Sequence, residues 1–126
     1  ISSNKINVNF TGRINNMNLV KYFNSHKLYI ICSLFEGAPK TLLEAMSCGI
    51  PCIGSNIDGI NNIIENNKNG LLCDLNYKSL NNQIDIIMND LNLGKNISNN
   101  SQKYIFMHHA QEKIIDIEYN IYKSIT

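Results

Sequence analysis

The sequence predicts an α/β protein built on a parallel, doubly wound sheet, and two observations carry this prediction. Short apolar runs, such as 28–32 and 50–54, alternate with segments whose apolar residues recur at helical spacing, such as 17–25. Glycine or proline separates these segments, as Gly49 does before 50–54. Strand–helix alternation requires crossover connections, which favour parallel strands covered by helices.

The first half of the chain is expected to contain two strands and two helices. Residues 6–10 alternate apolar and polar side chains, which is typical of a strand, and residues 17–25 have helical spacing. Residues 28–32 form a continuous apolar run, as expected for a strand buried on both faces. A helix is expected to begin near Pro39, because proline suits the first helical turn. It is expected to end at Gly49, because glycine suits the left-handed position after a helix.

The second half is expected to continue the alternation with strand 50–54, a short helix near 59–65, strand 70–73 and a helix whose apolar residues lie between 80 and 91. An Asn-rich stretch at 92–100 is expected to interrupt the helical pattern before two further helices, 101–109 and 110–125. We therefore expect one domain over residues 1–100 and a helical tail over residues 101–126 that packs on the same domain.

Polar residues follow the predicted strands at the edge where parallel sheets bind ligands. This edge is expected to hold Gly12, Glu36, residues 55–59 and Asp74. Beside Asp58, Gly59 would let a ligand approach the backbone closely. The binding site is therefore expected at this edge of the sheet.

The segment between Glu36 and Glu44 combines a helix start with two carboxylates. A helix start binds anions through its free N–H groups and its dipole, and Lys40 and Thr41, after Pro39, are the natural phosphate donors. Carboxylates beside such a site bind phosphate poorly and hydroxyl groups well. Phosphates and hydroxyl groups together indicate a sugar nucleotide.

Composition is that of a single globular domain. A chain of 126 residues can bury roughly two thirds of its unfolded surface, and 44% apolar and 17% charged residues are ordinary values. The net charge of +1 gives no reason to expect a nucleic-acid partner. No apolar run approaches a membrane span and no signal peptide is visible, so a cytoplasmic location is expected.

The four cysteines are predicted to be reduced, buried thiols rather than metal ligands. Each lies next to apolar residues, the usual setting of free cysteine in a cytoplasmic protein. Cys48 and Cys52 form the only near pair, and no second pair accompanies them, so the spacing does not fit a zinc site.

The stretch Glu36-Gly-Ala-Pro, four residues and Glu44, followed by Ala-Met-Ser-Cys-Gly-Ile-Pro, resembles the E-x7-E signature of retaining, GT-B-fold glycosyltransferases of family 4, the glycosyl transferases group 1. Residues 8–12 resemble the strand and glycine that precede this motif in the family. Residues 58–59 and 69–72 resemble the segments that follow it. The resemblance covers roughly residues 6–90.

This resemblance implies the Rossmann-like, donor-binding C-terminal half of a GT-B fold. Such a domain would take part in moving a hexose or N-acetylhexosamine from a nucleotide sugar, with a UDP-sugar favoured, to a glycan or lipid-linked acceptor, with bacterial surface polysaccharide synthesis as the context. No metal is implied, and the sequence contains no Asp-x-Asp site.

The resemblance also assigns roles to residues of the site. Glu36 would be catalytic, holding a donor-sugar hydroxyl and stabilising charge at the anomeric carbon. Glu44 would accept hydrogen bonds from the ribose hydroxyls. Arg13, after Gly12, would reach the base or the phosphates. The sugar and diphosphate would be contacted by Gly37, Ala38, Pro39, Lys40 and Thr41, with Asp58 and Gly59 in the next loop.

The sequence also departs from the family pattern. Members commonly have Pro-Glu two residues after the glycine at position 59, where this chain has Asn61-Asn62. The family's C-terminal domain opens with a strand and helix that carry an Arg and a Lys for the diphosphate, and its N-terminal domain carries the acceptor site. Both would precede residue 1, so this chain alone is expected to be inactive. The parent enzyme is expected at the cytoplasmic face of the inner membrane, associated peripherally.

Three alternatives remain at this point. One is a fragment of a UDP-sugar 2-epimerase of the same fold, and another is a non-catalytic module that binds a nucleotide or docks a partner. A flavodoxin-like receiver would need an acidic cluster after residues 6–10, which the sequence lacks. At the level of residues, Glu44 is alternatively an i,i+4 ion-pair partner of Lys40, worth about 0.3 kcal/mol, and Glu36 and Arg13 are alternatively solvated charges.

Overall fold

The computed structural model describes residues 6–109, 120, 121 and 123–125. In chain order the elements are α1 (Asn16–Ser25), β1 (Tyr29–Ile31), α2 (Lys40–Ser47), β2 (Cys52–Ser55), β3 (Leu71–Cys73), α3 (Tyr77–Asn89) and α4 (Leu91–His108). The three strands form one parallel sheet in the order β1-β2-β3. The predicted α/β class with a parallel sheet is therefore confirmed.

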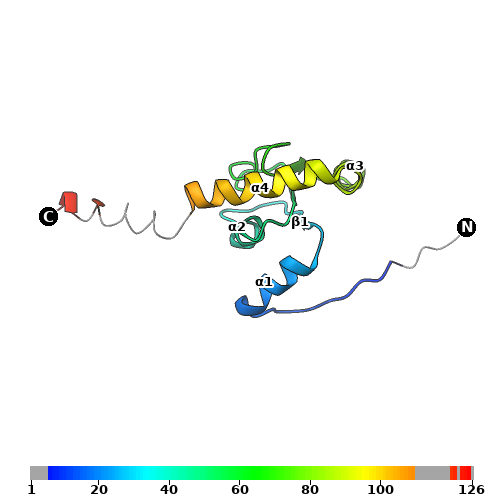
Figure 1. Ribbon diagram of the computed structural model, residues 1–126, viewed down its shortest axis with the longest axis horizontal. Helices are drawn as coiled ribbons and strands as arrows, with labels where there is room; N and C mark the ends of the chain where they lie inside the picture. Colours follow the sequence, from blue (N-terminus) through cyan, green and yellow to red (C-terminus); the bar gives the residue numbers. More distant parts are fainter. Residues whose placement is uncertain (1–5, 110–119, 122, 126) are drawn as a thin grey trace, which may run out of the picture.

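The helices form layers on the two faces of this sheet, and each layer covers a separate part of the core (Figure 1). On one face, α2 buries Leu42, Ala45 and Met46 completely. On the other face, α3 packs on β3 and α4 adds the buried Ile97. Because α4 also packs on α2, it holds the two layers together across the end of the sheet.

Strand β1 is less buried than the sequence predicted. Ile31 is buried, but the side chain of Ile30 is 38% exposed. Ile30 pairs in register with Ile53 and so lies on the same face of the sheet as the core beneath α3. That face is covered over β3, where α3 packs, and less over the edge strand β1. The prediction that residues 28–32 are buried on both faces is therefore wrong for one face.

The strand predicted at residues 6–10 is not formed. This segment runs as an extended trace away from the sheet (Figure 1), and Ile6 and Phe10 are 83% and 91% exposed. A strand is stable only when a neighbouring strand takes its hydrogen bonds. Within the described residues the sheet pairs only β1, β2 and β3. The alternating pattern alone therefore did not produce a strand here.

The Asn-rich stretch at 92–100 does not interrupt the chain's helical structure, contrary to the prediction, because α4 runs through it without a break. Asn is a poor helix former, but the difference from Ala is only a few tenths of a kcal/mol per residue. Packing outweighs it: Ile97 and Ser101 are buried, and the Asp90 side chain caps the helix by accepting from the Leu93 N–H at 2.9 Å.

Of the remaining expectations for the fold, one is confirmed, one is wrong and two are not tested by the described residues. The expected helix near 59–65 is a series of turns, and the expected helix over 110–125 lies mostly outside the described residues. The predicted division at residue 100 stays a prediction, and α4 passes through that boundary. Gly49 has φ +74 at the end of α2, which confirms the predicted left-handed stop.

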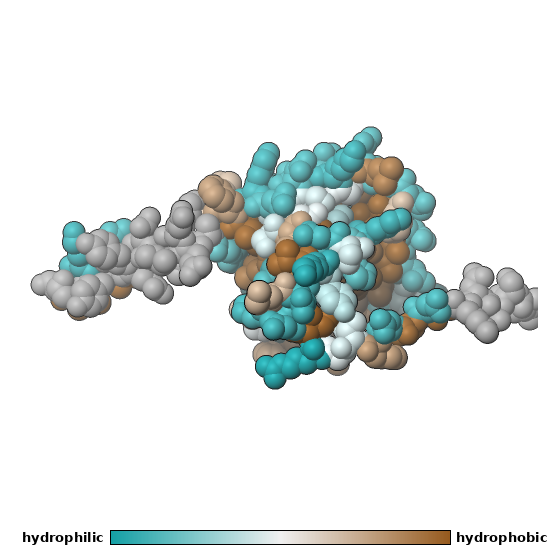
Figure 2. Space-filling model, turned by 60° about the horizontal axis from the view of Figure 1, so that its bottom comes forward, coloured by the Kyte–Doolittle hydropathy of each residue, from teal (hydrophilic) through white to brown (hydrophobic). Residues whose placement is uncertain are grey.

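The surface on the α1 side keeps apolar side chains. Figure 2 turns this side forward and shows hydrophobic atoms at the surface among hydrophilic ones. Met17 and Val20 of α1 are 82% and 49% exposed, whereas Phe23 faces α2 and is buried. Within the part of the chain that the structure describes, no helix combines the length and apolarity that a membrane span requires.

Candidate functional site

The carboxyl ends of β1 and β2 are joined by two serines. The backbone N–H of Ser33 donates to Ser55 Oγ at 3.1 Å, and Ser55 Oγ donates to the Ser33 carbonyl at 2.9 Å. Ser33 in turn donates its own hydroxyl to Glu36 Oε1 at 2.8 Å. The position of Glu36, which is partly buried, is therefore fixed from the end of β1.

The next loop packs directly against this segment at Gly59. Its φ is +90, and a Cβ at this position would lie 2.2 Å from the carbonyl oxygen of Glu36 and 2.7 Å from that of Gly37. Only glycine fits such a conformation at this distance. The close approach that the structure shows at Gly59 is thus made by the backbone of Glu36 and Gly37. The preceding residue, Asp58, is exposed in the same loop.

The N-terminus of α2 has no side-chain cap. The helix follows Pro39, which makes no side-chain cap hydrogen bond, and the first backbone N–H groups to bond within it are those of Leu42 and Leu43, to the Pro39 carbonyl. Within the described residues, the N–H groups of Lys40 and Thr41 have no hydrogen-bond partner. Such free N–H groups and the positive end of the helix dipole are suited to an anion.

Tyr29 reaches this helix start from β1. Its hydroxyl donates to Thr41 Oγ1 at 2.9 Å, although the two residues are twelve apart in sequence. Burial raises the pKa of Tyr29, and negative charge on Cys52, Glu36 and Glu44 adds to that rise, while a hydrogen bond from Thr41 to the deprotonated phenolate opposes it. The Tyr29 hydroxyl therefore stays protonated at neutral pH, within the electrostatic reach of both glutamates.

Glu44 lies one turn into α2 with its side chain 30% exposed. Its Oε1 is 3.7 Å from Lys40 Nζ, an i,i+4 pair whose lysine is 75% exposed. An ion pair of this exposure contributes little to stability. The pair leaves the carboxylate oxygens able to accept from other donors.

Gly12 and Arg13 are exposed on the segment before α1. Gly12 has φ +63, and a Cβ there would meet nothing within 4 Å. In the described part of the chain, no hydrogen bond or ion pair joins either residue to the α2 start. Of the predicted site residues, those from Glu36 to Glu44 and Gly59 lie close together and Gly12 and Arg13 do not join them, and the functional roles of all these residues stay predictions.

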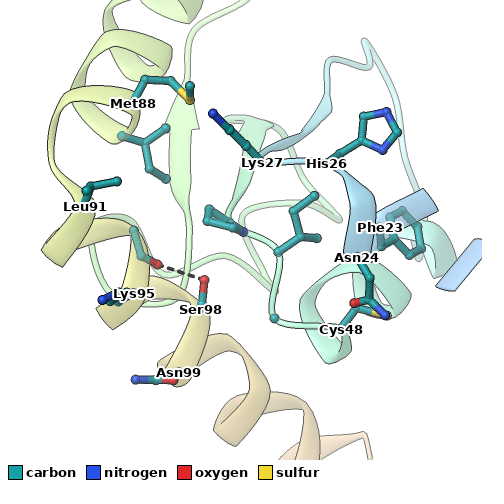
Figure 3. Close-up of a pocket in the computed structure, with 15 residues that line it drawn as sticks. Phe23, Asn24, His26, Lys27, Cys48, Met88, Leu91, Lys95, Ser98 and Asn99 are labelled. Carbon is teal, nitrogen blue, oxygen red and sulfur yellow. Dashed lines mark hydrogen bonds between the residues drawn. The ribbon is translucent and has the colours of Figure 1, made fainter. Parts of the chain in front are cut away.

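A cavity of about 620 Å³ lies at the opposite, amino-terminal edge of the sheet (Figure 3). Its walls come from the ends of α1 and α2, the start of β2 and the junction of α3 with α4, and its lining includes Phe23, Lys27, Pro51, Met88 and Lys95. None of the predicted site residues lines it. The size of a cavity therefore does not identify the predicted site in this protein.

The cysteines are free, as predicted, but Cys32 is exposed and Cys48 is only partly buried, so the prediction of burial is wrong for these two. Burial raises the pKa of the Cys52 thiol to about 12. Burial also raises the pKa of the Cys73 thiol to about 11, and the adjacent Cys32, which hydrogen-bonds to it, contributes to that shift. Among the described residues, no group of three or more His, Cys, Asp or Glu side chains is placed to hold a metal ion.

Two residues at the site were missed in the sequence. Ser33 has a weak local signal, because a serine three residues before Glu36 can bond its carboxylate. Tyr29 has no such signal, because its partner Thr41 comes close only after α2 packs back on the sheet. A tyrosine within a continuous apolar run is otherwise indistinguishable from a core residue.

Comparison with known proteins assigns the chain to a family. Residues 2–104 match the family described as glycosyl transferases group 1. The chain is 30% identical over 106 residues to a GalNAc-alpha-(1->4)-GalNAc-alpha-(1->3)-diNAcBac-PP-undecaprenol alpha-1,4-N-acetyl-D-galactosaminyltransferase of Campylobacter jejuni, covering 82% of this chain and 29% of that protein. The chain spans less than a third of the length of such curated relatives.

Solved structures share the fold at lower identity. A sucrose-phosphate synthase from Thermosynechococcus elongatus has a TM-score of 0.87 and 24% identity, covering 93% of this chain and 30% of that chain. Anabaena Alr3699/HepE in complex with UDP and glucose has a TM-score of 0.75 and 21% identity, covering 86% and 29%. The chain therefore belongs to the glycosyl transferases group 1, and its fold is the Rossmann-like C-terminal half of a GT-B glycosyltransferase.

Proposed function

We propose that this chain is the donor-binding domain of a retaining glycosyltransferase of family 4. The domain binds a nucleotide sugar, in the first place a UDP-sugar, whose hexose or N-acetylhexosamine passes to a glycan or lipid-linked acceptor. One observation carries the proposal: an uncapped helix start at the carboxyl edge of the sheet lies between two carboxylates.

Each part of the donor has a matching group at this edge. The diphosphate lies at the α2 start, where Lys40 and Thr41 offer free N–H groups. Glu44 accepts hydrogen bonds from the ribose hydroxyls. Glu36, held by Ser33, accepts from a sugar hydroxyl and stabilises positive charge that develops at the anomeric carbon. No metal takes part in this scheme.

The relatives support the choice of donor and acceptor. A solved structure of the same fold is a complex with UDP and glucose, and a curated relative is named for transfer to a diNAcBac-PP-undecaprenol glycan. By analogy, the parent enzyme works on a lipid-linked glycan at the cytoplasmic face of the inner membrane and contributes to bacterial surface polysaccharide.

The 126 residues bind the donor in this proposal but do not transfer the sugar by themselves. The acceptor site belongs to an N-terminal domain that would pack over the carboxyl edge. A helix dipole contributes only about 0.3–1 kcal/mol per charge at an exposed site. Lys40, the cation at this helix start in the described residues, is already paired with Glu44. Donor affinity of the isolated chain is therefore expected to be weak, in the millimolar range.

The test is a titration of the purified chain with UDP, GDP, ADP and their common sugars, followed by backbone amide shifts in NMR. We expect shifts in residues 36–44 and 55–59 that are largest for UDP and its sugars. Glu44→Ala should abolish the ribose-dependent part. Glu65→Ala is the matched control, because Glu65 forms a comparable exposed ion pair with Lys68 away from the site. Equal shifts for all variants, or none at millimolar nucleotide, would refute the proposal.

A non-catalytic nucleotide-binding module is the alternative that the pairing of Lys40 with Glu44 favours, because within the described residues the cation at the α2 start is then already paired. Adding back an N-terminal domain separates the two. Sugar transfer that requires Glu36 and Glu44 supports the transferase, whereas nucleotide binding without transfer supports the module.

A further inference from the structure

Tyr29 is held in place by three separate contacts, made by its backbone, its ring and its hydroxyl. The backbone N–H of Tyr29 donates to the Pro51 carbonyl at 2.9 Å, which fixes the start of β1 against the segment before β2. Its ring meets the Phe23 ring edge to face, with centroids 5.6 Å apart and planes at 90°. The hydroxyl then donates to Thr41 Oγ1 at 2.9 Å. Together these contacts fix the orientation of the Tyr29 side chain beside the N-terminus of α2.

This hydrogen bond determines what Thr41 can offer. A threonine hydroxyl has one proton to donate and lone pairs that accept. Because Thr41 Oγ1 accepts from Tyr29, its own proton is left to be donated, and Thr41 is exposed to solvent. The neighbouring backbone N–H groups of Lys40 and Thr41 are also donors without partners among the described residues. Three donors at one helix start match a group that only accepts, such as a phosphate oxygen.

We propose that Tyr29 is a positioning residue that orients the Thr41 hydroxyl to donate to the diphosphate of the bound nucleotide. This inference rests on the proposed donor-binding function. Tyr29 itself does not touch the ligand. Its effect passes through Thr41, so the inference predicts that Tyr29 matters for the phosphates and not for the nucleoside.

The experiment compares Tyr29→Phe with the unchanged chain, using three probes: UDP, uridine and inorganic pyrophosphate. Phenylalanine keeps the ring contact with Phe23 and removes only the hydroxyl. We expect UDP and pyrophosphate to bind about two- to tenfold more weakly, the range for the loss of one hydrogen bond, while uridine is unaffected. Tyr22→Phe is the matched control, because Tyr22 lies on α1 away from Thr41 and should change no affinity.

A second set of variants separates positioning from general support of the fold. Thr41→Val should weaken UDP binding, Thr41→Ser should restore it, and Tyr29→Phe should add nothing in the Thr41→Val background, because both changes act through the Thr41 hydroxyl. Additive losses, or an equal loss for uridine and UDP, would overturn the inference while leaving nucleotide binding intact. Absence of any UDP binding by the unchanged chain would overturn both the inference and the proposed function.

Discussion

The start of α2 differs from the starts of the other three long helices in the described chain. Asn15, Asn76 and Asp90 each accept a hydrogen bond from a backbone N–H in the first turn of α1, α3 and α4. Helix α2 begins after Pro39 with no such bond. A cap of this kind contributes about 0.5–2 kcal/mol. The chain thus caps the starts of α1, α3 and α4 itself and leaves the start of α2 uncapped, although α3 also begins at the carboxyl edge of the sheet, after β3.

The comparison also shows how an uncapped helix stays folded. At eight residues, α2 is too short to be stable alone, but Leu42, Ala45 and Met46 are completely buried. Burial on the inner side of α2 therefore compensates for the missing cap, and its N-terminal N–H groups remain available to a ligand.

The largest expected effect tests this compensation. Met46→Ala should destabilise the fold by about 2–5 kcal/mol, because the side chain is fully buried and a cavity remains. Met17→Ala, on the exposed side of α1, should change stability by less than about 0.5 kcal/mol. Urea unfolding of both variants measures the difference. Comparable losses would show that burial does not hold α2.

A second prediction concerns the loop that supports the helix start. Gly59→Ala should cost about 1–3 kcal/mol, because its Cβ would meet the Glu36 carbonyl at φ +90. It should also shift the NMR signals of Glu36 and Gly37. Gly94→Ala is the control: it lies within α4, where a Cβ meets nothing within 4 Å, and should stabilise by about 0.5–1 kcal/mol. Unchanged stability in Gly59→Ala would mean that the two loops are not in contact.

A third prediction tests the capped starts directly. Asp90→Ala should destabilise the protein by about 0.5–2 kcal/mol, because the Leu93 N–H loses its acceptor. The neighbouring Asn89→Ala removes an exposed side chain without a cap role and should be nearly neutral. Thermal unfolding of both variants distinguishes the loss of the helix cap from the effect of removing any side chain between α3 and α4. A neutral Asp90→Ala would remove the contrast with α2.

The features of the fold that could be predicted from the sequence are those that depend on interactions between residues close together in the chain. The strand–helix alternation, the Gly49 stop and the grouping of Glu36 with Glu44 depend on neighbours in sequence, and the pattern predicted them. The failures involve partners far away in the chain. Residues 6–10 have the pattern of a strand but, among the described residues, no strand beside them. Residues 92–100 contain poor helix formers, and packing against α2 and α3 outweighs their low propensity.

The site shows the same division. The free N–H groups after Pro39 could be expected from a proline before a helix, which contributes no side-chain cap. The link from Tyr29 to Thr41 could not, because it spans the distance between β1 and the returning helix. Gly59 was predicted as a position of close ligand approach; the group that approaches it in the structure is the backbone of Glu36 and Gly37, and the approach of a ligand stays a prediction.

The smallest expected effect is the pH dependence of stability that Tyr29, the residue hydrogen-bonded to the α2 start, contributes. The folded-state pKa of Tyr29 is raised by burial, so the folded protein holds this proton at a pH where the unfolded chain releases it. The resulting stability is fully present below pH 10, the ordinary tyrosine value, and is lost as the pH rises through the folded-state pKa.

Cys52, with a pKa raised to about 12, gives a loss of stability of the same sign above pH 9. Cys52 is present in both proteins, so the difference between the unchanged chain and Tyr29→Phe reports the tyrosine together with its electrostatic interaction with Cys52. Unfolding free energies measured from pH 8 to 11 should fall less steeply above pH 10 in Tyr29→Phe, and parallel curves would place Tyr29 in an environment like that of a solvated tyrosine.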